Sequence, residues 1–306
     1  MNFKKANKII LIFLAVLLIM PPFIYWAGVN ILNKTSGSIV SGNEKRNYLI
    51  HIPKGYTGEK PVPLVLSFHG FADWPSHMMD MSGWNSLADR EGFIAVFPEG
   101  IGFPRRWRTK GKYGSGLDDD PQKDVAFVSE LIDHLSSKYK IDPRKIYANG
   151  LSNGGGMSHL LACKLSGKIA AIAGVAGAYT VDTAECRPLR PVPFMFFHGT
   201  ADKIVPFRGG TSGKIIMPDI SGFSSRWAEQ NGCSEKISST VSTNVSRIEY
   251  TTCRGNADVV LYTITDAGHT WPGGKPMPEF ITGTTSDEIN ATELIWKFFK
   301  SVSQYH

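Results

Sequence analysis

The sequence predicts an α/β fold in which helices cover both faces of a doubly wound, mostly parallel sheet. Two observations predict it. Short, nearly continuous apolar runs recur along the chain, as strands that are buried on both faces require. Segments whose apolar residues recur at helical spacing separate these runs. Strands that alternate with helices in this way are typical of a parallel sheet that is covered on both sides.

The strands are predicted from the pattern of apolar residues. Residues 46–52 (RNYLIHI) alternate in polarity, as a strand does. Residues 62–68 (VPLVLSF) and 92–97 (GFIAVF) are nearly continuously apolar, so we expect buried strands there. The remaining predicted strands cover 145–149, 169–177 and 192–199, followed by a hairpin over 246–268 that turns near Gly255 and Asn256.

The helices are predicted from apolar residues that recur on one side of a 3.6-residue period. They cover 124–139, a segment that begins near Asn153, then 221–230 and 286–300. In the first helix the inward positions are Val125, Val128, Leu131, Ile132, Leu135 and Tyr139. In the last they are Ile289, Leu294, Ile295, Phe298 and Phe299.

The N-terminal residues 1–33 differ from the rest of the chain. Three lysines precede the apolar run IILIFLAVLLIM, an order that is typical of a secretory signal. The uncharged stretch 9–32 is also long enough to anchor the chain in a membrane. We therefore expect a location outside the cytoplasm, secreted or periplasmic, and the sequence leaves cleavage and anchoring as alternatives.

The rest of the chain is assigned to a linker and one domain. Residues 34–44 are polar and are assigned to the linker. Residues 45–306 are assigned to a single α/β domain, because they are long enough to bury a sizeable core. The formal net charge of the 306 residues is +6, and half of it comes from Lys4, Lys5 and Lys8. The sequence has no run of basic residues interleaved with aromatic ones, so we expect no nucleic-acid partner.

Four cysteines, Cys163, Cys186, Cys233 and Cys253, make an even count, which favours disulfides in an exported chain. Three pairings are possible. We favour Cys163 with Cys186 and Cys233 with Cys253, because each pair closes a short local loop. The sequence lacks the CxxC and HxxxH spacings of common metal sites, so no metal is expected.

The segment 150–154 (GLSNG) fits the pattern G-x-S-x-G and lies between a predicted strand and a predicted helix. This setting is typical of a turn that presents a nucleophilic serine, here Ser152. The flanking glycines are needed because the turn is tight. The backbone amide of Asn153 then lies at a helix N-terminus, where it can donate to an oxyanion.

A serine hydroxyl needs a base to act as a nucleophile at neutral pH. His269 follows the last predicted strand, and Asp202 follows the strand at 192–199, so both are expected at the carboxyl edge of the sheet. The order serine, acid, histidine is that of one class of hydrolases. We expect Asp202 to hold the imidazole of His269 in one tautomer. Asp266 is a weaker candidate for the acid.

A second oxyanion donor is expected after the strand at 62–68, where the segment HGFADWP bends at Gly70. The backbone amide of Phe71 is our candidate, and the alternative is that this segment is only a turn. Trp271 and Trp107 are candidates for the wall of a substrate pocket. The alternative is that each is a large residue that only packs in the interior.

Together these segments resemble the exported poly(3-hydroxybutyrate) depolymerase-like esterases, a family that also contains feruloyl and acetylxylan esterases. The resemblance is carried by HG at 69–70, GLSNGG at 150–155, HGTAD at 198–202 and GHTWPGG at 268–274. It extends from Tyr48 to Phe299, nearly the whole domain. It implies an α/β-hydrolase fold and hydrolysis of carboxylic esters without a cofactor. It also supports Ser152, Asp202 and His269 as the triad, and the favoured cysteine pairing.

The substrate class stays open at this point. Secreted polymer depolymerases of this family usually carry a separate surface-binding domain, which is not found after the last predicted helix. A soluble ester, an oligomer or a decorated polysaccharide is therefore expected as readily as a solid polymer. Two alternatives to hydrolysis are an acyltransferase that uses the same triad and a non-catalytic binding protein on the same fold.

Overall fold

The computed structural model describes residues 32–109, 120–180, 186–212 and 215–302. The chain divides into two compact units, residues 1–34 and 35–306, and the second unit contains the whole sheet. Almost all of the predicted export segment, 1–33, lies outside the described residues. Within the described residues, none of the helices has the length and apolar character that crossing a membrane requires.

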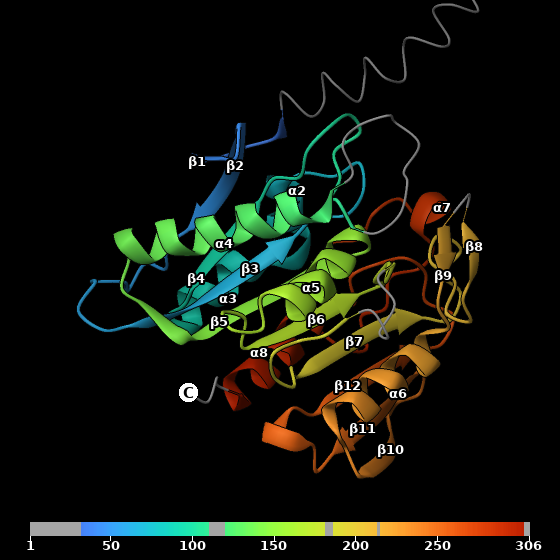
Figure 1. The fold of residues 1–306 in the computed structure, drawn as a ribbon. Helices are drawn as coiled ribbons and strands as arrows, with labels where there is room; N and C mark the ends of the chain where they lie inside the picture. The colour runs from blue at the N-terminus through green and yellow to red at the C-terminus, as the bar shows by residue number, and fades with distance from the viewer. Residues whose placement is uncertain (1–31, 110–119, 181–185, 213–214, 303–306) are drawn as a thin grey trace, which may run out of the picture. The chain divides into compact units, whose positions relative to one another are not determined.

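A ten-stranded sheet forms the centre of the domain, in the order β1-β2-β4-β3-β5-β6-β7-β12-β11-β10 (Figure 1). Its six central strands are parallel, and two antiparallel strands extend it at each edge. The central strands are β4 (Ile94–Pro98), β3 (Val62–Phe68), β5 (Ile141–Leu151), β6 (Ala171–Val175), β7 (Phe194–Gly199) and β12 (Val259–Ile264). The edge strands are β1 (Gly37–Ser41), β2 (Glu44–His51), β11 (Val245–Thr251) and β10 (Glu235–Ser242), and a separate ribbon joins β8 (Gly210–Ser212) to β9 (Ile215–Met217).

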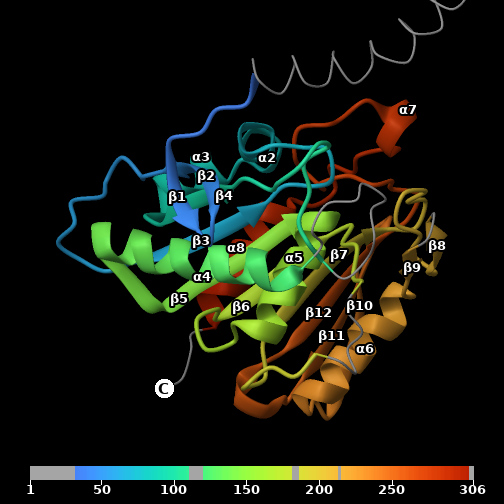
Figure 2. The same cartoon turned by 45° about the horizontal axis from the view of Figure 1, so that its top comes forward.

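Helices cover both faces of this sheet, so the predicted doubly wound α/β class is confirmed (Figures 1 and 2). One face carries α4 (Pro121–Lys138), α5 (Asn153–Lys164) and α6 (Ile220–Asn231). The other carries α2 (Pro75–Ser82), α3 (Trp84–Glu91) and α8 (Ala291–Ser301). Two short helices, η1 (Arg254–Asn256) and α7 (Glu279–Thr282), lie in loops.

The alternation of side chains along β3 explains why its sequence is almost wholly apolar. Leu64 and Leu66 pack in the core beneath α4, α5 and α6, whereas Val65 packs in the core beneath α2, α3 and α8. All three side chains are fully buried. A strand that contributes to two cores has no face left for polar residues.

Capping residues set the ends of the helices. Asp120 accepts a hydrogen bond from the Gln122 amide at the start of α4, and Asp219 accepts one from the Gly222 amide at the start of α6. Asn290 does the same for α8 by accepting from the Glu293 amide. The predicted start of this last helix at residue 286 is therefore too early, because the cap lies at Asn290.

Three further differences from the predicted elements have local causes. Residues 37–41, assigned to the linker 34–44, form β1 and pair antiparallel with β2, so that assignment is corrected. Strand β10 was not predicted because nearly all of its side chains are exposed and it lacks an apolar alternation. The helices α2 and α3 were not predicted because each has only eight residues and a left-handed Gly83 separates them.

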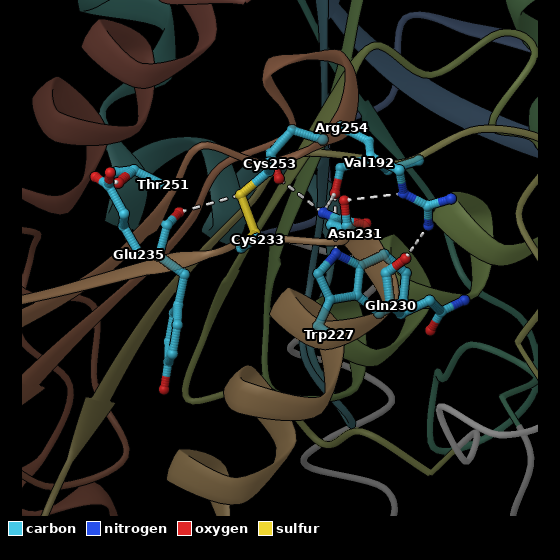
Figure 3. Close-up of a disulfide and its surroundings, with 11 residues drawn as sticks. Val192, Trp227, Gln230, Asn231, Cys233, Glu235, Thr251, Cys253 and Arg254 are labelled. Carbon is cyan, nitrogen blue, oxygen red and sulfur yellow. Dashed lines mark hydrogen bonds between the residues drawn. A yellow bond between two sulfur atoms is a disulfide. The ribbon is translucent and has the colours of Figure 1, made fainter.

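The two disulfides join Cys163 to Cys186 and Cys233 to Cys253, the pairing that the sequence analysis favoured. Figure 3 shows the second bond, which connects the loop after α6 to the end of β11. Beside it, the buried Asn231 side chain donates from Nδ2 to the carbonyl oxygens of Val192 and Ala257. The disulfide and this amide together tie α6 to the loops at one end of β7 and β12.

Candidate active site

Ser152 lies on the turn between β5 and α5, with φ of 55° and ψ of −118°. A positive φ is rare for a residue with a side chain, so the surrounding structure must hold this conformation. The turn is closely packed. A Cβ atom on Gly154 would lie 2.0 Å from the carbonyl oxygen of Phe68, and one on Gly150 would lie 2.4 Å from the carbonyl carbon of Gly154. Only glycine fits at either flank of the serine.

His269 and Asp202 form a buried hydrogen-bonded pair. Nδ1 of His269 lies 2.7 Å from Oδ2 of Asp202, and the two side chains are 6% and 0% exposed. Asp202 follows β7, and its other oxygen, Oδ1, accepts from the amides of Ile204 and Val205 at 2.8 Å each. These amides fix the carboxylate, so Asp202 can orient the ring of His269.

A second histidine also approaches this carboxylate. Nε2 of His198 lies 2.8 Å from the Val205 carbonyl oxygen and 3.4 Å from Oδ2 of Asp202. Burial alone would raise the pKa of the Asp202 carboxyl, but the hydrogen bonds from His198 and His269 hold that pKa well below its ordinary value. Asp202 is therefore ionised at neutral pH. No local pattern in the sequence marks His198 for this role.

Ser152 and His269 line the same cavity, which has a volume of about 300 Å³. Gly70 and Phe71 belong to its wall as well, so the loop after β3 faces the serine. A Cβ atom on Gly70 would lie 3.6 Å from the Cβ atom of Ser152. The structure thus brings together one end of three strands, β3, β5 and β7, and the loop after β12.

Asn153 is the first residue of α5, and the first amides of a helix have no partner within it. Its buried side chain braces a neighbouring segment. Oδ1 accepts from the Trp107 amide at 2.7 Å, and Nδ2 donates to the Trp107 carbonyl oxygen and to Oγ1 of Thr109 at 3.3 Å. The side chain of Asn153 therefore points away from the cavity and holds residues 107–109 against α5.

His69 is fully buried and acts as a brace. Its Nε2 accepts from the Gly100 amide at 2.9 Å, so Nδ1 carries the proton and donates to the Gly70 carbonyl oxygen at 2.7 Å. Burial lowers the pKa of this imidazole, with the charges around it as smaller influences. A neutral His69 thus fixes the backbone of the loop that carries Phe71.

The expectation that Trp107 and Trp271 line a substrate pocket is wrong for the cavity of Ser152, because neither residue belongs to its wall and both indoles are buried. Trp107 donates from Nε1 to the His69 carbonyl oxygen and packs edge-on against Phe68. Trp271 donates from Nε1 to Oγ1 of Thr292 and packs in the core beneath α8. Each indole fills the interior and satisfies its N–H there.

The cavity wall is instead formed by residues that the sequence analysis missed, among them Trp74, His77, Ile204, Met277 and Ile281. Trp74 ends the loop that carries Phe71, and His77 lies in the first turn of α2 directly after it, so their closeness in sequence to the candidate oxyanion donor was the available signal. Met277 and Ile281 come from a loop far away in sequence, where no local pattern marks them.

One group of side chains with metal-ligating atoms close together occurs among the described residues: His159, Cys163 and Cys186. The two cysteines are bonded to each other, so neither offers a thiolate, which is the form that binds metals. This group is part of the core, and without a free thiolate its three side chains do not indicate a metal site.

Residues 46–187 match the family model described as esterase PHB depolymerase. The resemblance to this esterase family is confirmed. Feruloyl esterase B of Piromyces equi is 32% identical over 246 residues, which cover 77% of this chain and 45% of that protein. The bifunctional acetylxylan esterase/xylanase XynS20E of Neocallimastix patriciarum is 29% identical over 201 residues, 66% of this chain and 26% of that protein. The chain thus spans less than half the length of each of these two relatives.

A solved structure supports the fold. The acetyl xylan esterase from Aspergillus awamori superposes with a TM-score of 0.55 at 16% sequence identity, over 76% of this chain and 93% of that one. At this identity the likeness concerns the fold alone, and it shows that the sheet and its helices have the α/β-hydrolase fold.

Proposed function

We propose that the protein is an exported serine carboxylic-ester hydrolase in which Ser152 is the nucleophile, His269 the base and Asp202 the acid. One observation carries the proposal: Ser152, on its strained turn, faces the same cavity as His269, and His269 is bonded to a buried carboxylate. A serine, a histidine and an ionised acid in this arrangement are the parts that acyl transfer needs.

In the proposed mechanism, His269 takes the proton of Ser152 as the serine oxygen attacks the ester carbonyl carbon. Asp202 stabilises the imidazolium that forms. The backbone amides of Asn153 and Phe71 donate to the oxyanion of the tetrahedral intermediate. His269 then returns the proton to the departing alcohol, and water releases the acid from the acyl-enzyme by the same steps. Loss of one oxyanion donor costs about 3 kcal/mol of transition-state stabilisation.

The proposed substrates are esters with a hydroxyalkanoate, feruloyl or acetyl group, and no cofactor is needed. The names of the related esterases support this range, and the mostly apolar cavity suits such acyl groups. Transfer of the acyl group to a sugar is the alternative, because it uses the same residues. Export agrees with the two disulfides, which persist in oxidising compartments.

The Ser152→Ala variant tests the proposal. We expect hydrolysis of p-nitrophenyl butyrate to fall by at least about 10³-fold, because the acyl-enzyme cannot form. Thermal unfolding should stay close to that of the wild type, since the change removes one hydroxyl group. Unaltered activity in this variant would exclude Ser152 as the nucleophile. Product analysis with and without a sugar acceptor separates hydrolysis from transfer.

A further inference from the structure

The cavity that contains Ser152 also contains a second histidine–carboxylate pair, outside the proposed triad. Nδ1 of His77 lies 2.7 Å from Oδ1 of Asp73. Asp73 precedes α2 and His77 lies in its first turn, so the pair has the i, i+4 spacing that brings side chains together. Both residues line the cavity wall.

The surroundings fix the position of this pair. Oδ1 of Asp73 also accepts from the Trp74 amide at 2.8 Å, and the Asp73 side chain is only 12% exposed. The indole of Trp74 lies against the imidazole, with ring centroids 5.4 Å apart. His77 is therefore held by Asp73 at one nitrogen and by Trp74 at its ring.

The other nitrogen of His77 is available to a ligand. The His77 side chain is 34% exposed, and Nε2 has no hydrogen-bond partner among the residues that the structure describes. The hydrogen bond with Asp73 raises the pKa of His77, burial opposes this rise, and the charge of Asp80 supports it while that of Lys275 opposes it. The charged imidazolium, whose Nε2 is a donor, is thus favoured by its surroundings.

Most of the remaining wall is apolar, and includes Phe71, Leu151, Ile204, Met277 and Ile281. In an apolar cavity, a few polar groups determine which ligand binds and in which orientation. Among the described residues that line this wall, the ionisable groups other than Ser152 and His269 are Asp73 and His77. These two side chains are therefore the candidates for contact with a polar group that a substrate carries beyond its ester.

We propose that His77, positioned by Asp73, determines specificity by donating a hydrogen bond from Nε2 to an acceptor oxygen of the substrate beyond the scissile ester. A carboxylate is the strongest such acceptor, because its charge is opposite to that of the imidazolium. This inference rests on the proposed esterase function and adds the class of substrate: esters that carry a second, anionic oxygen function.

Matched substrates test the inference on either side of the ester. Methyl pentanoate and monomethyl glutarate differ by a carboxylate in place of a methyl group on the acyl side. Butyl acetate and 4-acetoxybutanoate differ in the same way on the alcohol side. The quantity measured is the ratio of kcat/KM for the charged ester to that for the neutral ester. In the wild type we expect this ratio to favour the charged ester in one pair, which then identifies the side that faces His77.

The His77→Phe variant keeps a ring beside Trp74 and removes the donor. We expect it to lower the ratio about tenfold in that pair, since a hydrogen bond to a charged group is lost. Asp73→Asn provides a second variant, which keeps an acceptor for the Trp74 amide and removes the charge that holds the proton on His77. Like His77→Phe, it should lower the ratio of kcat/KM in the same pair of esters.

Two controls separate this role from a general effect of charge. Lys275→Met removes an exposed positive charge outside the cavity wall, and should change the ratio by less than about twofold because solvent screens it. In the wild type the ratio should fall as the pH rises through the raised pKa of His77, where the proton on Nε2 is lost.

The outcomes are distinguishable. If the wild type hydrolyses the neutral esters but His77→Phe leaves both ratios within about twofold, the inference is overturned and the esterase proposal stands. An equal fall in Lys275→Met also overturns it, because the effect is then one of overall charge. If the wild type hydrolyses p-nitrophenyl butyrate but none of these four esters, this inference alone is overturned; if it hydrolyses neither, the proposed function and this inference fail together.

Discussion

Ser152 shows how much a single residue depends on its neighbours. Its backbone, with a positive φ, is held by the Ser152 amide, which donates to the Val175 carbonyl oxygen, and by the Ser152 carbonyl oxygen, which accepts from the amides of Gly156 and Ala178. A Cβ atom on Gly156 would lie 2.2 Å from the Ala178 carbonyl oxygen. The glycines behind the serine therefore let α5 approach the end of β6, and they are not a flexible loop.

Gly154→Ala tests this close packing. The new Cβ atom would lie 2.0 Å from the Phe68 carbonyl oxygen, so the backbone must shift, and we expect the free energy of unfolding to fall by about 3 kcal/mol. Hydrolysis of p-nitrophenyl butyrate should also be lost. Gly167→Ala is the control, because its Cβ atom would meet only Leu189 Cδ1 at 3.9 Å. Urea unfolding measures both, and equal stability of the two variants would contradict the packing argument.

At the scale of elements, the first turn of α4 is coupled to the segment 107–109. The buried Asp124 accepts from Nη1 of Arg46 and from the Arg108 amide at 2.6 Å each, and from Nη1 of Arg108 at 3.1 Å. Glu44 accepts from Arg108 as well. Residues 107 and 109 in turn bind the side chain of Asn153, so this ionic network links β2 and α4 to the start of α5.

Asp124→Asn should lower the free energy of unfolding by about 3 kcal/mol, because two buried guanidinium groups then lose their shared carboxylate. Asp133→Asn is a matched control on the same helix. Asp133 is 67% exposed and pairs with Lys168, so its loss should cost less than about 1 kcal/mol. Chemical unfolding of both variants checks the prediction, which is wrong if Asp124→Asn is as mild as its control.

At the scale of the whole domain, the core beneath α5 and α6 contains a histidine that must stay neutral. His159 is surrounded by the rings of Tyr179, Phe194, Phe223 and Trp227. Burial lowers its pKa from 6.5 to about 3. Below pH 6.5 the unfolded chain takes up a proton at this site that the folded chain does not, so folding becomes less favourable as the pH falls.

His159→Leu should therefore flatten the dependence of stability on pH. Between pH 7 and pH 5, the site removes about 2 kcal/mol from the free energy of unfolding of the wild type, and the variant lacks this loss. Phe223→Leu, which changes a ring that contacts His159, is the control and should destabilise the protein equally at both pH values. If the variant and the wild type lose the same free energy, His159 is not the source.

Much of the fold could be predicted from local patterns. The alternation of strands and helices predicted the class, and apolar runs predicted the central strands because those strands are buried on both faces. Where burial is low, as in β10, or where elements are short, as in α2 and α3, the patterns carried too little information. The placement of Ser152, Asp202 and His269 at one edge followed from strand order alone.

The sequence by itself determined the α/β class, the G-x-S-x-G turn and the chain order of Ser152, Asp202 and His269, because periodicity and order along the chain are local properties. Only the tertiary structure decided that Trp107 and Trp271 are interior residues, that His198 shares the Asp202 carboxylate, and that Asp73 and His77 face the cavity of Ser152. The reason is physical: burial and charge depend on which loops meet at the edge of the sheet, and those loops lie far apart in sequence.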